Sequence, residues 1–76
     1  MDYKVDSKGI GKKLRELRGY KPRRVVAEEI GITERALVSY ESGERIPRDE
    51  VKIKLSNYYK VPIQKLFFYE SATRNE

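Results

Sequence analysis

The side chains with the richest hydrogen-bonding chemistry stand close together in the stretch TERALVS, residues 33–39. On a helix, Glu34 and Arg35 share one face with Val38 and Ser39, because positions three and four apart are neighbours. That face offers a carboxylate, a guanidinium and a hydroxyl, with the small Ala36 at its margin. A short, mostly polar surface of this kind suits recognition of a partner by hydrogen bonds.

The chain lacks the groups on which most catalytic and metal sites depend. It contains no cysteine and no histidine, which excludes disulfides and ordinary Cys/His zinc sites. It has no glycine-rich phosphate loop and no serine with a partner base. Asp49 and Glu50 are adjacent, so on a helix they point about 100° apart and do not converge. We therefore predict no enzymatic activity, no metal and no cofactor.

Positive charge is concentrated at the start of the chain. Residues 1–24 hold nine Lys/Arg against three Asp/Glu, whereas residues 25–76 hold eight against nine. Such asymmetry suggests an anionic partner, either nucleic acid or an acidic membrane surface. Binding to a membrane surface is poorly supported, because the basic first helix carries only three aliphatic anchors and needs them for the core.

Length and hydropathy indicate one small domain. The 76 residues contain no apolar run near the roughly 18 residues of a membrane span, and the longest is LFFY at 66–69. The N-terminus lacks the apolar segment of a signal peptide. We expect a cytoplasmic protein with an N-terminal arm at 1–7, one domain at 8–68 and a frayed tail at 69–76.

The spacing of apolar residues predicts five helices. Ser7 is the expected N-cap of the first, whose apolar stripe is Ile10, Leu14 and Leu17 and which ends at Gly19. The second has Pro22 in its first turn and stops at Gly31. The third begins after Thr33 as N-cap and closes at Gly43.

The last two helices are less regular in sequence. In RDEVKIKLSNYY, Val51, Ile53 and Leu55 alternate as in a strand, but Val51, Leu55 and Tyr59 also fit a helical stripe. A lone strand would have no partner, so we predict a helix, with Ile53 at the edge of the core or in an interface. A short fifth helix is expected to begin near Pro62.

The connection between the second and third helices is very short. Close packing there requires a small side chain, which Ala27 provides, and a residue that tolerates positive φ, which Gly31 provides. Leu37 then points into the shared core. The polar face of the third helix is left free to enter a major groove.

The segment RRVVAEEIGITERALVSYES resembles the helix-turn-helix of phage repressor and Cro-type regulators. IGKKLRELR, YESGERIP and VPIQKLF are similar to its flanking segments, so the resemblance covers residues 8–68. It implies an all-α, compact five-helix, lambda-repressor-like domain that binds an operator in double-stranded DNA as a homodimer.

The resemblance also implies residue roles. Glu34, Arg35 and Ser39 occupy base-reading positions, and Ala36 a position that touches a thymine methyl. Arginine suits guanine O6 and N7, and glutamate suits cytosine N4. The expected phosphate contacts are Lys21, Arg23, Arg24, Thr33 and Arg45. Arg18 and Glu41 resemble a structural pair that joins the first and third helices.

Three departures from the family pattern bear on the phosphate contacts. The connection GYKP at 19–22 is two residues shorter than usual. Pro22-Arg23 replaces the common Ser-Gln, and Glu44 stands where a lysine is common. A carboxylate at that position would face phosphate unfavourably.

The function expected from these residues is sequence-specific repression of transcription, in a regulator of phage or mobile-element type with no evident small-molecule effector. The candidate dimer interface is Ile53, Phe68 and Tyr69, since exposed apolar residues indicate a partner surface. The alternative is a protein-interaction module, such as an antitoxin or antagonist built on the same fold.

Overall fold

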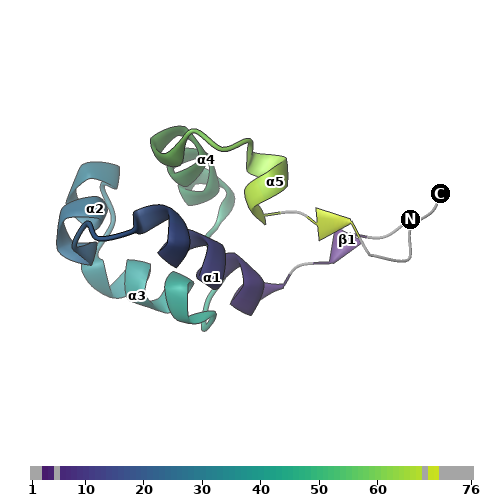
Figure 1. Cartoon of the computed structure of the whole chain (residues 1–76), viewed down its shortest axis with the longest axis horizontal. Coiled ribbons are helices and arrows are strands. Elements are labelled where there is room, and N and C mark those ends of the chain that lie inside the picture. The colour runs from purple at the N-terminus through teal and green to yellow at the C-terminus, as the bar shows by residue number, and fades with distance from the viewer. Residues whose placement is uncertain (1–2, 5, 68, 71–76) are drawn as a thin grey trace.

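The computed structural model describes residues 3–4, 6–67 and 69–70, and it consists of five helices around one core (Figure 1). The helices are α1 (Ser7–Arg18), α2 (Arg23–Ile30), α3 (Glu34–Ser42), α4 (Asp49–Tyr59) and α5 (Ile63–Phe67). The predicted all-α, five-helix fold is confirmed, and so is the choice of helix over strand for the fourth segment.

A small pairing of the chain ends adds to the helices. Strand β1 (Tyr3–Lys4) runs antiparallel to β2 (Tyr69–Glu70), with Tyr3 opposite Glu70 and Lys4 opposite Tyr69. This pair lies beyond α5, at the end of the molecule opposite α2 (Figure 1). Of the tail expected to be frayed, residues 69–70 are thus paired, and residues 71–76 lie outside the described part.

Two helix starts differ from the sequence prediction. Asp6, not Ser7, is the N-cap of α1, because its carboxylate accepts the N–H of Gly9 at 3.1 Å. Pro22 precedes α2 as its N-cap, with an extended ψ of 144°, instead of lying in its first turn. Its carbonyl accepts the N–H of Val26 at 3.2 Å, so the chain turns helical only at Arg23.

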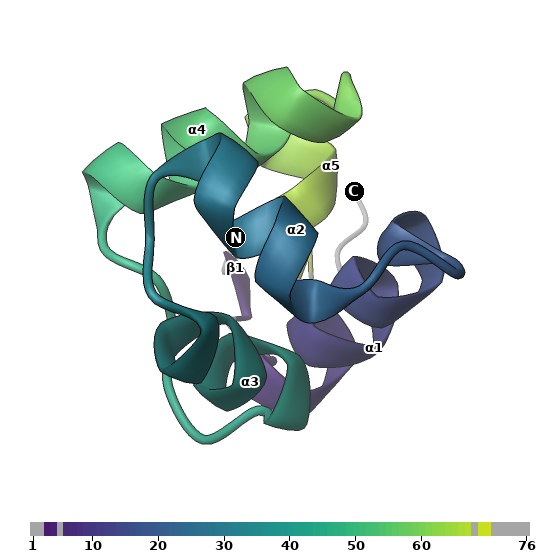
Figure 2. The same ribbon diagram turned by 90° about the vertical axis from the view of Figure 1, so that its left-hand side faces the viewer.

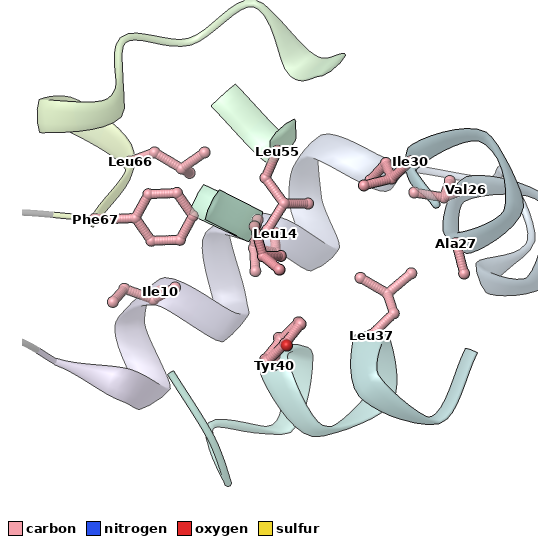
Figure 3. Close-up of a cluster of buried hydrophobic side chains, with 11 residues drawn as sticks. Ile10, Leu14, Val26, Ala27, Ile30, Leu37, Tyr40, Leu55, Leu66 and Phe67 are labelled. Atoms are coloured by element: carbon pink, nitrogen blue, oxygen red, sulfur yellow. The ribbon is translucent and has the colours of Figure 1, made fainter. Parts of the chain in front are cut away.

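All five helices contribute to the core (Figure 3). Its buried members are Ile10, Leu14, Val26, Ala27, Ile30, Leu37, Tyr40, Val51, Leu55, Leu66 and Phe67. The assignment of Leu17 to the buried stripe was wrong, since 37% of its surface is exposed. Ile10 and Leu14 are four residues apart, and the next position on the same face of the helix is Arg18. The side chain of Arg18 turns towards α3.

The backbones of α1 and α3 approach each other very closely at Gly11. A Cβ atom added there would lie 2.3 Å from the carbonyl oxygen of Glu41 and 2.8 Å from that of Tyr40. Only glycine fits such a contact. This contact sets the position of α3 against α1.

Candidate nucleic-acid interface

A three-residue turn joins α2 to α3. Gly31 has φ 92° and ψ 34°, in the left-handed region. The N–H groups of Gly31 and Ile32 both donate to the carbonyl of Ala27, at 2.8 and 2.9 Å. Thr33 Oγ1 accepts the N–H of Ala36 at 3.0 Å and caps α3. The predicted roles of Gly31 as C-cap and Thr33 as N-cap are confirmed.

One side of α3 is buried and the other is open. Leu37, Tyr40 and Glu41 are buried against α1 and α2. Glu34 and Arg35 are exposed on the opposite side, together with Val38. In Figure 2, α1 and α2 lie over one side of α3 while its lower side faces outward. The turn and the core therefore present the polar face of α3 to solvent.

A buried carboxylate anchors the C-terminal half of α3. Only 1% of the Glu41 side chain is exposed, and its oxygens accept from Arg18 Nε at 2.8 Å, Arg18 Nη2 at 3.1 Å and Arg23 Nε at 2.9 Å. Arg15 Nη1 donates to the main-chain oxygen of Glu41 at 3.2 Å. The hydrogen bond with Glu41 raises the pKa of Arg18 above its ordinary value. Three arginines thus fasten α3 to α1 and to the start of α2.

Arg23 is part of this network and is therefore not wholly free to contact phosphate. The sequence suggested a phosphate contact, whereas its Nε is bonded to Glu41. Its side chain nevertheless remains 39% exposed, so part of the guanidinium stays accessible. Because two arginines face one carboxylate, the network keeps an excess of positive charge beside α3.

Lys21 lies towards α4. Its Nζ donates to the hydroxyl of Tyr58 at 3.0 Å and to Glu29 at 3.4 Å, and the same hydroxyl donates to Glu29 Oε1. The hydrogen bond to Tyr58 is the main cause of a raised pKa at Lys21 and of a lowered pKa at Glu29. These contacts tie the α1–α2 connection to α2 and α4 and engage the ammonium group of Lys21.

The remaining cationic candidates for DNA contact are Arg45, Arg24 and Arg35. Arg45 packs its guanidinium over the Tyr40 ring, 5.5 Å from the centroid. Arg24 is 69% exposed and only 3.9 Å from Glu28, a loose surface pair. Within the described residues, Arg35 makes no hydrogen bond or ion pair. Its guanidinium is therefore available to a partner.

Comparison with known proteins bears on this geometry. A family model for the helix-turn-helix matches residues 12–66. The chain belongs to the helix-turn-helix family of the Cro type. No curated protein matches the sequence.

Two solved structures resemble this helix-turn-helix domain. The DNA-binding domain of BldD is 29% identical, with a TM-score of 0.67, and the match covers 82% of this chain and 93% of that one. The SOS-response transcriptional repressor LexA from Eubacterium rectale is 20% identical, with a TM-score of 0.73, covering 96% of this chain and 80% of that one. The second likeness concerns the fold alone. The family match and the fold support a DNA-binding regulator of transcription.

Some residues that position the helix-turn-helix escaped sequence analysis. Gly11 is one, although a glycine inside an amphipathic helix signals a packing reason. Arg15 is another, and no local pattern distinguishes it from the other cations of α1. Ala36 is half-buried against the core, so only part of its methyl group is open to a base.

The residues expected at a dimer interface are only partly described. Ile53 is 53% exposed on α4, where it lines a groove between α4 and α5. Tyr69 belongs to β2, and Phe68 lies outside the described residues. No helix in the described part of the chain is long and apolar enough to cross a membrane. Residues 3–4, 6–67 and 69–70 contain no group of three or more His, Cys, Asp or Glu suited to a metal.

Proposed function

We propose that this helix-turn-helix protein is a sequence-specific repressor of phage or mobile-element type that reads the major groove of double-stranded DNA with α3. The observation that carries this proposal is the exposed guanidinium of Arg35, which has no partner among the described residues, on a helix whose other side is fixed by the core and by Glu41. An arginine in that position can bond guanine O6 and N7 together.

The surroundings of α3 support phosphate contacts on either side of the base-reading face. Arg24 and Arg45 are exposed, and the hydroxyl proton of Thr33 is not needed for its capping bond, in which the oxygen accepts. The exposed part of the Arg23 guanidinium can also contact a phosphate. Contacts of this kind fix the register of the protein on the duplex without selecting a sequence.

The test is a fluorescence titration with a pool of duplex DNA at two salt concentrations, comparing the native chain with Arg35→Ala. The native chain should select a subset of sequences and bind more weakly as salt rises. Arg35→Ala should lose about 1–3 kcal/mol of discrimination at one base pair. Weak binding of the native chain without sequence preference would overturn the proposal.

We propose further that the protein binds its operator as a homodimer through Ile53 and the chain end at Tyr69 and Phe68. An isoleucine this exposed, next to a groove lined by Val61, Pro62 and Ile63, offers apolar area to a second copy. Ile53→Glu should reduce dimerisation on a duplex with two half-sites. Analytical ultracentrifugation of the complex measures how many copies are bound. Lys54→Glu, an exposed charge change on the same helix, is the matched control.

The same groove favours a second candidate function, a protein-interaction module that binds another protein through α4 and α5. The two functions differ in salt dependence. Phosphate contacts make the affinity for DNA fall steeply with salt, whereas a protein binder has no need of Arg35.

A further inference from the structure

Ser39 and Glu44 form a pair at the C-terminal end of α3. Ser39 Oγ donates to Glu44 Oε1 at 3.4 Å. In return, the backbone N–H of Glu44 donates to the carbonyl of Ser39 at 3.0 Å, and the N–H of Arg45 donates to it at 3.3 Å. Glu44, which lies beyond the helix in sequence, is thus held as an extension of its outward face.

The turn that carries Glu44 is itself fixed. Gly43 has φ 83°, and its N–H donates to the carbonyl of Tyr40 at 3.2 Å. A Cβ atom added at Gly43 would lie 2.9 Å from Lys8 Cγ and 3.0 Å from Lys8 Cα. The turn therefore packs directly on the first turn of α1, and this contact sets where the backbone of Glu44 lies beside α3.

The protons and lone pairs of Ser39 and Glu44 determine which hydrogen bonds the pair can make with a base. A serine hydroxyl has one proton and two lone pairs, and an ionised carboxylate has only acceptors. Since the Ser39 proton is donated to Glu44, the pair presents acceptors alone. The donors in the major groove are the exocyclic amino groups, cytosine N4 and adenine N6. Adenine also presents the acceptor N7, which repels a carboxylate oxygen, so cytosine suits the pair better.

We propose that Ser39 and Glu44 act as one unit that reads the N4 amino group of a cytosine, with Glu44 as the base-contacting residue and Ser39 as the residue that positions it. The inference rests on the proposed reading of DNA by α3 and deepens it. It also gives a role to Glu44, a carboxylate at a position where a lysine is common in the family. Together with Glu34 at the other end of α3, it places an acceptor on each side of Arg35.

The experiment measures affinities for a selected half-site and for duplexes in which each of its base pairs is changed in turn. Glu44→Ala should reduce the preference for cytosine about tenfold at one position. Glu44→Gln should move the preference at that position towards adenine, because an amide can bond N6 and N7 together. Ser39→Ala should weaken the preference at the same position.

Ser42→Ala is the matched control for the serine. Its hydroxyl donates to the carbonyl of Ser39 at 3.1 Å, and within the described residues it makes no hydrogen bond to Glu44. It should leave every preference unchanged. Circular dichroism and a thermal melt establish that each variant is folded.

Each outcome decides the question. If Glu44→Ala changes the affinity for all duplexes by one common factor, Glu44 acts only by repelling phosphate and the inference is wrong. It is also wrong if Ser39→Ala alters a different position from Glu44→Ala. A loss of preference in Arg35→Ala with none in Glu44→Ala would overturn this inference alone. Absence of preference in the native chain would overturn the proposed function as well.

Discussion

The stability of the domain should depend strongly on the buried pair of Arg18 and Glu41 and only weakly on Arg23. Arg18→Ala removes two of the three side-chain hydrogen bonds to a carboxylate that is 1% exposed. Breaking a buried ion pair from one side costs about 3–5 kcal/mol. Because Arg23 remains as a partner, we expect a loss near the lower limit, about 3 kcal/mol.

The contrast comes from exposure. The side chain of Arg23 is 39% exposed, against 14% for Arg18. Solvent screens an exposed pair, which typically contributes about 1 kcal/mol or less. Arg23→Ala should therefore cost no more than this. Arg18→Lys should fall between the two alanine variants, because it keeps the charge but loses the paired geometry of the guanidinium.

Urea unfolding at low temperature, followed by circular dichroism, measures these differences even in a weakened variant. In a domain of this size, 1 kcal/mol corresponds to about 4–8 °C in Tm, so Arg18→Ala should melt at least about 12 °C below the native chain. Equal losses for Arg18→Ala and Arg23→Ala, both below about 1 kcal/mol, would refute the view that the buried pair anchors α3.

Three further predictions concern single positions. Gly11→Ala should cost more than about 2 kcal/mol in urea unfolding, because its Cβ would lie 2.3 Å from the Glu41 carbonyl oxygen. Thr33→Ala should cost about 1 kcal/mol by removing the cap of α3. Burial raises the pKa of Tyr59 from 10.0 to about 12, so folding favours the neutral phenol, and stability present below pH 10 should be lost as pH rises towards 12. Tyr59→Phe should remove that loss and cost nothing at neutral pH, since the buried hydroxyl has no hydrogen-bond partner in the part of the chain that the structure describes.

Controls separate these effects from general damage. Gly19→Ala meets no atom within 4 Å and is strained only by its φ of 61°, so it should cost less than Gly11→Ala. Thr33→Ser keeps the capping oxygen and should retain most of the stability. An unchanged alkaline loss in Tyr59→Phe would show that another group titrates. A Gly11→Ala variant as stable as the native chain would contradict the close contact of α1 with α3.

Sequence patterns predicted the elements well because local chemistry decides them. Left-handed φ at Gly31 and Gly43 and capping by Thr33 depend on neighbours within a few residues. The same holds for the five helices, whose apolar spacing is visible in the chain. The choice of Ser7 over Asp6 as the first cap was wrong because two adjacent residues can both cap a helix.

Long-range contacts between charged side chains were harder to predict. The sequence suggested that Lys21 and Arg23 contact phosphate, but Lys21 bonds Tyr58, which is 37 positions away, and Arg23 bonds Glu41. Nothing in the local pattern tells which cation a buried carboxylate will recruit. The pair of Arg18 and Glu41 was predicted from the resemblance to a family in which these positions form a structural pair.

The division of α3 into a fixed inner side and an open outer side has a consequence for redesign. Glu34 and Arg35 are exposed and lie outside the apolar core, so either can be exchanged with little effect on stability. A library that varies these two positions would therefore retain folded members and could be retargeted to new operators. Ser39 and Glu44 should be varied jointly, because a new side chain at one leaves the other without its hydrogen-bond partner.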